Sequence, residues 1–257
     1  MVDAGSFLTT AKLLQVLAVA AVGVYTYRKE MLNAAGAFTA FTMGALIVLF
    51  TNLSWLLLLF ALLALGSAAT RFRFAEKEAK KVSEKQGGRR STRNVIANGA
   101  TPAILAVAAP FVAQLWGPDV AGIAYVSAIA VAAADTLASE FGSLAKRVYM
   151  ITTLKQVPAG VDGGVSFPGQ MAALAGGTII ALLGWLFLGV LSMGELHVGF
   201  TPATLLIPIL CGFVGCQIDS ILGATVEGNG LFTKEETNLV SISAGALLGL
   251  VLGILST

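Results

Sequence analysis

The chain has 257 residues, of which 56% are hydrophobic and only 12% are charged, with a formal net charge of +2. Soluble domains carry about 25% charged residues, so this composition excludes a soluble core of this size. The apolar runs are long and continuous rather than alternating, which favours membrane-spanning helices over a β-barrel.

A helix that crosses a bilayer needs about 20 predominantly apolar residues. Eight such segments are expected, over Phe7–Thr26, Met31–Phe50, Leu53–Thr70, Val95–Trp116, Val120–Ala138, Gln170–Met193, Thr201–Cys216 and Asn238–Ser256. Only Thr51 and Asn52 separate the second from the third, which predicts a tight turn, and the seventh is short enough that an extension past Asp219 is open. The sequence therefore predicts an all-α polytopic transmembrane helix bundle of about eight spans, with residues 1–257 in a single integral membrane domain.

The distribution of positive charge predicts the orientation of this bundle. Nine of the 16 Lys and Arg residues lie between Arg71 and Arg93, and the positive-inside rule places that basic loop, residues 71–94, in the cytoplasm. Counting spans from there puts 15 of the 16 on the same side. The exception, Lys12, can snorkel from the outer end of the first helix. Both termini are therefore expected to face outward.

Three residues of kinds that often carry chemistry are expected to carry none here. His197 is the only histidine and lies in a short outward loop, so we expect a plain surface residue. Cys211 and Cys216 are five residues apart on one predicted helix and point to different sides, which disfavours a disulfide. The sequence contains neither a Ser-His-Asp pattern nor a Cys/His zinc pattern.

The inward segments, in contrast, hold unusual polar residues. Asn94 and Asn98 share one helical face at the membrane boundary, where buried amides need partners. The preceding stretch, residues 74–84, mixes Lys and Glu and could form a surface helix. Lys77 to Lys85 are explained as a basic patch against anionic lipid, at about 1 kcal/mol per cation.

Two acidic segments follow helices that run inward. Asp135 ends the fifth predicted helix, and Ser139 shares its face. Asp219-Ser220-Ile221 repeats the order of Asp135-Thr136-Leu137, which is Asp, hydroxyl, aliphatic. An ionisable residue here favours a functional site, with a solvated helix end as the alternative.

A glycine-rich segment precedes the sixth predicted helix. Backbone N–H groups of Gly160–Gly169 can converge on an anion, and Ser166 and Pro168 suit a helix start. Helix N-termini favour phosphate, although this is not a Walker motif and a flexible connector is the alternative. Together with the carboxylates Asp135, Glu140, Asp162 and Asp219, the segment predicts an inward-facing site for Mg²⁺ and a polyphosphate.

These same stretches, Arg93–Gly99, Ala134–Gly142, Ile151–Lys155, Gly160–Ser166 and Asp219–Ala224, resemble in order and spacing a family of integral membrane proteins. The family includes the phytyl-phosphate kinases of plants and cyanobacteria. It is distantly similar to the CTP-dependent dolichol and phytol kinases, whose pattern Gly-Asp-x-x-Ala-Ser-x-x-Gly has Ala134 here in place of its first glycine. Asp162-Gly163-Gly164 stands where those kinases have Glu-Gly, so the nucleotide stays open.

The resemblance implies transfer of a phosphate from a nucleoside triphosphate, CTP favoured, to an isoprenyl monophosphate such as phytyl or geranylgeranyl phosphate. Asp135, Lys155 and Asp219 would be catalytic: the two carboxylates would hold Mg²⁺ and the lysine would neutralise the transferring phosphate. Nucleotide or lipid phosphate would be bound by Arg93, Asn94, Asn98, Ser139, Glu140, Asp162, Gly163, Gly164, Ser166 and Ser220. The expected partners are membrane lipids, the isoprenyl phosphate and the nucleotide, with no nucleic acid and with homo-oligomerisation left open.

Three other functions remain compatible with the sequence. A CTP-dependent lipid cytidylyltransferase would use similar groups but release pyrophosphate. A transporter also has intramembrane carboxylates, but its site lies near the midplane, and no convincing inverted repeat is visible here. A structural membrane protein with a basic lipid-binding loop would leave the segments around Asp135 and Asp219 without a role.

Overall fold

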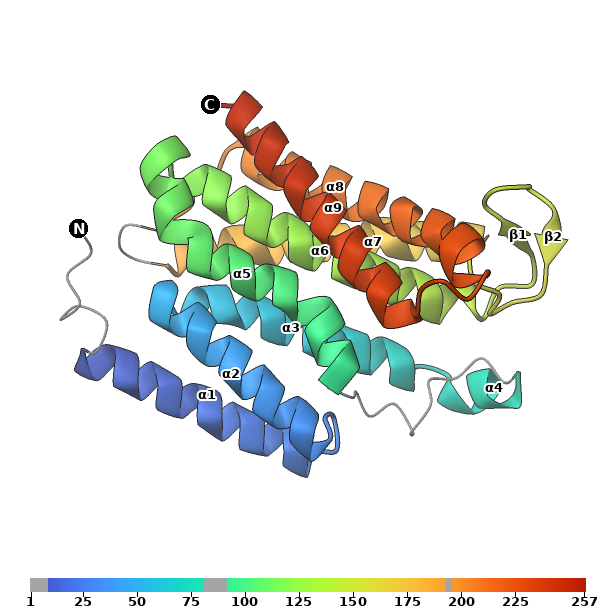
Figure 1. Cartoon of the computed structure of the whole chain (residues 1–257), viewed down its shortest axis with the longest axis horizontal. Helices are drawn as coiled ribbons and strands as arrows, with labels where there is room; N and C mark the ends of the chain where they lie inside the picture. The colour runs from blue at the N-terminus through green and yellow to red at the C-terminus, as the bar shows by residue number, and fades with distance from the viewer. Residues whose placement is uncertain (1–8, 81–91, 193–195) are drawn as a thin grey trace.

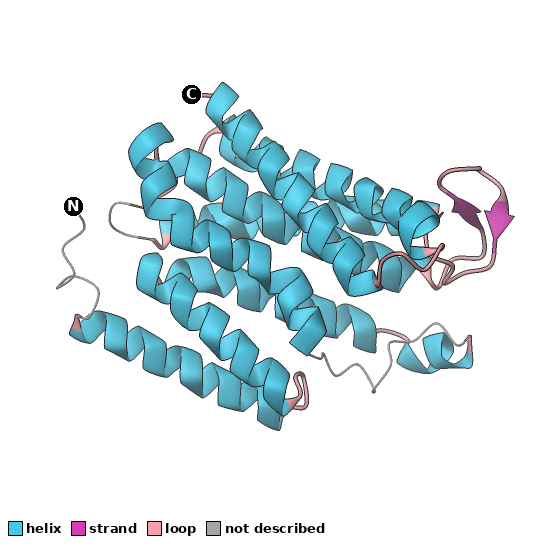
Figure 2. Cartoon of the chain, in the orientation of Figure 1, coloured by secondary structure: helices cyan, strands magenta, loops and turns pink. Residues whose placement is uncertain are grey.

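The computed structural model describes residues 9–80, 92–192 and 196–257. The helices of these residues are α1 Thr10–Arg28, α2 Ala34–Phe50, α3 Leu53–Arg71, α4 Phe74–Ala79, α5 Thr92–Trp116, α6 Pro118–Gly142, α7 Phe167–Gly184, α8 Pro202–Leu222 and α9 Lys234–Leu255. Two π-helical segments, η3 Trp185–Val190 and η4 Gly223–Glu227, extend α7 and α8. Short strands β1 Val148–Met150, β2 Gln156–Val157 and β3 Gly164–Val165 form an antiparallel sheet in the order β2-β1-β3. Strands β1 and β2 project from one end of the helical bundle (Figures 1 and 2).

The expected bundle of about eight spans is confirmed. Seven of the described helices are long and apolar enough to cross a membrane, and the 17-residue α2 is a shorter apolar helix. The turn at Thr51 and Asn52 is as tight as expected, because α2 ends at Phe50 and α3 begins at Leu53. The start of α1 and the end of α9 lie at one end of the bundle, opposite the strands (Figure 1).

Helix α6 forms the centre of the bundle and packs against α3, α5, α7, α8 and α9. Every residue from Val120 to Asp135 is buried. The neighbouring helices approach closely through glycines: a Cβ atom at Gly212 of α8 would lie 3.1 Å from Ala130 Cβ. Membrane helices associate through small residues of this kind. Lipid tails are as apolar as the side chains, so the hydrophobic effect does not drive two helices together, and the van der Waals contacts of closely packed backbones do so instead.

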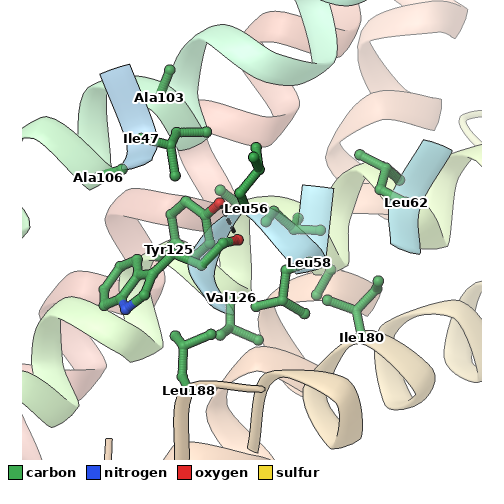
Figure 3. Packing of buried hydrophobic residues seen from close by; sticks show 14 of the residues in the cluster. Ile47, Leu56, Leu58, Leu62, Ala103, Ala106, Tyr125, Val126, Ile180 and Leu188 are labelled. Carbon is green, nitrogen blue, oxygen red and sulfur yellow. Dashed lines mark hydrogen bonds between the residues drawn. The ribbon is translucent and has the colours of Figure 1, made fainter. Parts of the chain in front are cut away.

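Aromatic side chains connect α6 to α3 within this core. The hydroxyl of Tyr125 donates a hydrogen bond of 2.8 Å to the carbonyl oxygen of Trp55, and the two ring centroids are 4.8 Å apart. Ile47, Leu58 and Leu188 lie in the same cluster (Figure 3). The bond satisfies a phenol that is fully buried among apolar groups.

Several helix ends differ from those expected. The predicted fifth span stopped at Ala138, but α6 continues to Gly142, so Asp135 lies inside the helix rather than at its end. The helix can continue because protein, not lipid, surrounds it, and polar residues find partners there. The seventh span does extend past Asp219, since α8 and η4 continue to Glu227, whereas α9 begins at Lys234 rather than at Asn238. The predicted boundaries Phe7 and Met193 lie outside the described residues.

The interpretation of Lys77 as part of a lipid-binding patch is wrong. Lys77 is 1% exposed, and its Nζ lies 2.5 Å from Glu140 Oε2 of α6 and donates a 2.7 Å hydrogen bond to the Ala69 carbonyl. A lysine loses so much hydration on burial that it is stable there only with such partners. The remainder of the predicted basic patch, residues 81–91, lies outside the described residues.

Lys12 contacts the C-terminal end of α2. Its ammonium group donates hydrogen bonds to the carbonyl oxygens of Val48, at 2.6 Å, and of Thr51. These carbonyls belong to the C-terminal turn of α2, where cations are favoured by the helix dipole, so Lys12 caps α2.

The expectations for the histidine and the two cysteines are confirmed. His197 is exposed, and Cys211 and Cys216 are buried and form no disulfide.

Candidate functional site

A polar cavity of about 260 Å³ lies where the C-terminal ends of α6 and α8 and the N-terminal end of α7 meet the start of α9 and the loop that contains the strands. Eight of the residues singled out from the sequence line it. They are Asp135, Ser139, Asp162, Gly163, Gly164, Ser166, Asp219 and Ser220. Residues far apart in the sequence are therefore brought to one place, because α6 and α8 both end at this cavity and the segment between β1 and α7 lies beside them.

The acidic pair Asp135 and Asp219 lies at the centre of this arrangement. Their carboxyl groups, from α6 and α8, line the same cavity and interact electrostatically with each other. Ser241 Oγ of α9 donates a 3.0 Å hydrogen bond to Asp219 Oδ1, and Asp135 is only 8% exposed. Two adjacent, poorly hydrated carboxylates repel each other, so the site is suited to a bound cation.

The glycine-rich loop is anchored on both sides of the cavity. Ile151 N donates to Gly163 O at 3.0 Å, and Ser166 caps α7 by accepting a 3.2 Å hydrogen bond from Gly169 N. Gly163 has φ of +75°, and a Cβ atom there would lie 2.6 Å from Ala224 Cα of η4. The loop is packed tightly against η4, whereas a flexible connector would lack such close contacts. The N-terminus of α7 faces the cavity, since Gly169 of its first turn lines it.

Lys155, the lysine singled out by the resemblance, does not line the cavity. It is exposed in the turn between β1 and β2, where its carbonyl accepts a 2.9 Å hydrogen bond from Met150 N. Lys234, at the start of α9, lines the cavity instead and interacts electrostatically with Asp135 and Asp219. Sequence reasoning counted Lys234 only as an inward positive charge.

Glu227 and Gln170 also line the cavity and were not singled out from the sequence. Glu227 interacts electrostatically with Asp162 and Lys234. Both residues fall near helix boundaries that hydropathy placed wrongly. A usable signal for the true start of α9 was Thr233-Lys234-Glu235-Glu236, which has the form of a capping box and forms one here.

Four other predicted site residues lie away from the cavity. Asn94 and Asn98 line a separate apolar cavity of about 70 Å³ among α2, α3 and α5, and Asn98 Nδ2 donates a 2.9 Å hydrogen bond to Asn94 O. Arg93 lines neither cavity. Glu140 is paired with Lys77 and accepts a 2.6 Å hydrogen bond from Thr70 Oγ1. The structure thus separates these residues from the acidic pair.

The donor set of the cavity fits a divalent cation only in part. Among the described residues, it is lined by one basic residue, Lys234, and by four acidic residues, Asp135, Asp162, Asp219 and Glu227. Within residues 9–80, 92–192 and 196–257, no three His, Cys, Asp or Glu side chains are grouped closely enough to hold a metal ion by themselves. Mg²⁺ commonly takes one or two carboxylates and completes its shell with water and substrate phosphate, which the pair of Asp135 and Asp219 suits.

Comparison with known proteins identifies the family. The chain is 30% identical to Uncharacterized membrane protein MJ0933 of Methanocaldococcus jannaschii, over 92% of each chain. It is 32% identical to Uncharacterized membrane protein sll0875 of Synechocystis, over 86% of this chain and 83% of the other.

A plant relative is also similar. The chain is 30% identical to Protein VTE6, chloroplastic, of Arabidopsis thaliana, over 86% of this chain and 65% of that protein. No solved structure matches the chain significantly. The model of one family, Integral membrane protein DUF92, matches residues 17–249. That span covers nearly all of the bundle and every residue lining the polar cavity, and the chain therefore belongs to the DUF92 family of integral membrane proteins.

Proposed function

We propose that this protein is a membrane kinase that transfers the γ-phosphate of a nucleoside triphosphate, with CTP the favoured donor, to an isoprenyl monophosphate. The similarity to the chloroplast protein VTE6 and the resemblance to phytyl-phosphate kinases support this activity. The observation that carries the proposal is the pair of carboxylates, Asp135 and Asp219, in a cavity beside the N-terminus of α7 and a glycine-rich loop.

The residues of the cavity suit the binding of phosphate. The first turn of α7 directs the positive end of its dipole toward the cavity, and Ser166 and Gly164 line the same wall. Helix N-termini and glycine-rich backbone bind phosphate oxygens through N–H groups. Phosphoryl transfer needs mainly positioning and neutralisation of charge, and these groups supply both in the cavity that the two carboxylates line.

The excess of carboxylates in the cavity means that a polyphosphate needs a metal ion in order to bind there. The described residues place four carboxylates and one ammonium group in the lining, and this excess of negative charge would repel a bare polyphosphate. We assign Asp135 and Asp219 as the residues that would hold Mg²⁺, which supplies neutralisation of the phosphate charge when bound.

The reaction needs no general base from the protein. An oxygen of the lipid phosphate, already ionised at neutral pH, forms a bond to the γ-phosphorus. The bond from that phosphorus to the bridging oxygen of the nucleotide breaks, and its electron pair leaves with the nucleoside diphosphate. This agrees with the position of His197, the sole histidine, in the segment between α7 and α8, away from the cavity.

The lipid enters from the bilayer and the nucleotide from the aqueous side. The cavity lies at the inward end of the spans, so the lipid phosphate can reach it while the isoprenyl tail stays in hydrocarbon, where each buried CH₂ contributes about 0.8 kcal/mol. The same end carries α4 and the start of α5 and is, by the positive-inside rule, cytoplasmic. A transporter would instead need its polar site near the midplane.

The experiment that tests the proposal is a transfer assay with purified protein. Phytyl and geranylgeranyl phosphate are each incubated with Mg²⁺ and each of the four ribonucleoside triphosphates. Formation of the isoprenyl diphosphate together with a nucleoside diphosphate is expected. Release of pyrophosphate would identify a cytidylyltransferase instead, and the absence of turnover with every pair would remove the kinase proposal.

A further inference from the structure

We infer that Lys234, and not Lys155, is the cation that binds the nucleotide phosphates in the polar cavity. The inference deepens the proposed function and rests on it. It assigns a phosphate-binding role to a residue at the start of α9, far along the sequence from the glycine-rich loop.

The position of Lys234 is fixed by the start of α9. Thr233 caps this helix, and Glu236 Oε2 accepts a 2.7 Å hydrogen bond from Thr233 N, which completes a capping box around Lys234. Both helix-end bonds hold the backbone from which the lysine extends. The lysine is therefore presented to the cavity by a rigid element rather than by a mobile loop.

The surroundings of Lys234 are acidic on three elements. It interacts electrostatically with Asp135 of α6, Asp219 of α8 and Glu227 of η4. Glu227 also interacts electrostatically with Asp162 of the glycine-rich loop. These contacts keep the ammonium group in the cavity before any ligand arrives. An entering phosphate can share it, because a lysine has three N–H donors.

Lys155 has none of these features. It lies in the exposed turn after Leu154, whose φ is +55°, and no residue from Thr152 to Gln156 lines the cavity. A charge in water at a distance from the phosphates would be screened strongly. The geometry therefore favours the lysine that is remote in sequence over the lysine that precedes the glycine-rich loop.

Measurements of nucleotide binding distinguish the roles of Lys234 and Lys155 and do not depend on phosphate transfer. Equilibrium dialysis of radiolabelled CTP and ATP with Mg²⁺ is carried out on wild type, Lys234→Ala, Lys234→Arg, Lys155→Ala and Lys146→Ala. Loss of a charged hydrogen bond to phosphate should weaken binding about tenfold or more in Lys234→Ala. Lys234→Arg should retain most of the affinity, whereas Lys155→Ala and the exposed control Lys146→Ala should stay within about twofold of wild type.

The inference is overturned if Lys155→Ala loses affinity and Lys234→Ala does not, if both keep it, or if the wild type binds neither nucleotide. Thermal unfolding without nucleotide checks that each variant is folded, and Lys234→Gln replaces the alanine variant if that one is unstable. Failure of transfer to every lipid would remove the kinase proposal, but the binding comparison would still decide the role of Lys234.

Discussion

At the scale of single residues, the paired carboxylates are the feature that folding alone explains least. Asp135 is 8% exposed and lies in the same cavity as Asp219, and among the described residues that line this cavity Lys234 is the one basic residue. Burying a carboxylate beside another carboxylate destabilises a fold unless a cation or proton compensates. A site that keeps such a pair in a membrane protein is therefore explained by binding.

Replacing either aspartate by asparagine should abolish transfer and leave the fold intact. Asp135→Asn and Asp219→Asn each remove a charge needed to hold the cation, and we expect a loss in kcat of about a hundredfold or more. The free energy of unfolding without Mg²⁺ should stay the same or rise, because like-charge repulsion is removed. The measurements are transfer rate against Mg²⁺ concentration and thermal unfolding.

The matched control is Glu78→Gln on α4, an exposed carboxylate at the same end of the bundle. It should keep the rate of the wild type. Full Mg²⁺-dependent rates in both aspartate variants would remove the proposed site even if the protein proved to be a kinase.

At the scale of elements, the glycine-rich loop depends on its contact with η4. Gly163 combines φ of +75° with a position where a Cβ atom would lie 2.6 Å from Ala224 Cα. Gly163→Ala should therefore cost about 2–4 kcal/mol from strain and overpacking together. It should also weaken nucleotide binding, because the loop must move away from η4. Thermal unfolding and equilibrium dialysis measure the two effects.

Gly230 provides the comparison for this prediction. Its φ is +73°, but a Cβ atom there would meet no atom within 4 Å. Gly230→Ala should therefore cost only the strain of the left-handed backbone, about 1–2 kcal/mol. Equal losses in the two variants would show that the contact with Ala224 does not matter.

A second link between elements joins α4 to the bundle. Lys77 of α4 is paired with Glu140 of α6, and Glu140 also accepts a hydrogen bond from Thr70 of α3. Lys77→Met would leave the Glu140 carboxylate buried without its cation, which should cost about 3–5 kcal/mol. The double variant Lys77→Met with Glu140→Gln should recover part of that loss. Unfolding of the purified variants in detergent measures both.

Lys80→Met is the control for charge removal on α4. Lys80 pairs with Glu76 at 3.2 Å on the exposed side of the helix, and the hydrogen bond from Lys80 lowers the pKa of Glu76. Because water solvates both groups, this pair contributes little to stability. A loss in Lys80→Met as large as that in Lys77→Met would contradict a specific role for the buried pair.

At the scale of the whole molecule, some features could be predicted from sequence and others could not. The spans were predictable because bilayer thickness sets the length of an apolar run, and Asp135 and Asp219 stood out because carboxylates are rare there. Hydropathy misplaced the ends of α6, α8 and α9, since protein contacts let polar residues continue a helix. The burial of Lys77 depends on a partner in α6, distant in sequence.

The proposed role of Lys234 depends on the same long-range packing. The spacing along the chain pointed to Lys155, which precedes the glycine-rich loop. Only the convergence of α6, α8 and α9 brings Lys234 to the acidic pair. The local sequence pattern was enough to identify the glycine-rich loop. It could not identify Lys234, because α9 reaches the cavity only through the packing of helices that are distant in sequence.

The orientation of the whole bundle gives the last prediction. Eight spans put both ends of the chain outside and the cavity inside, so Thr257→Cys should react with a membrane-impermeant maleimide in spheroplasts. Lys80→Cys, exposed on α4, should react only after permeabilisation. Native Cys211 and Cys216 are buried and should contribute little background. Labelling of both positions from one side would contradict the eight-span count. Labelling of Lys80→Cys alone from outside would place the cavity away from cytoplasmic nucleotides, which is incompatible with the proposed kinase.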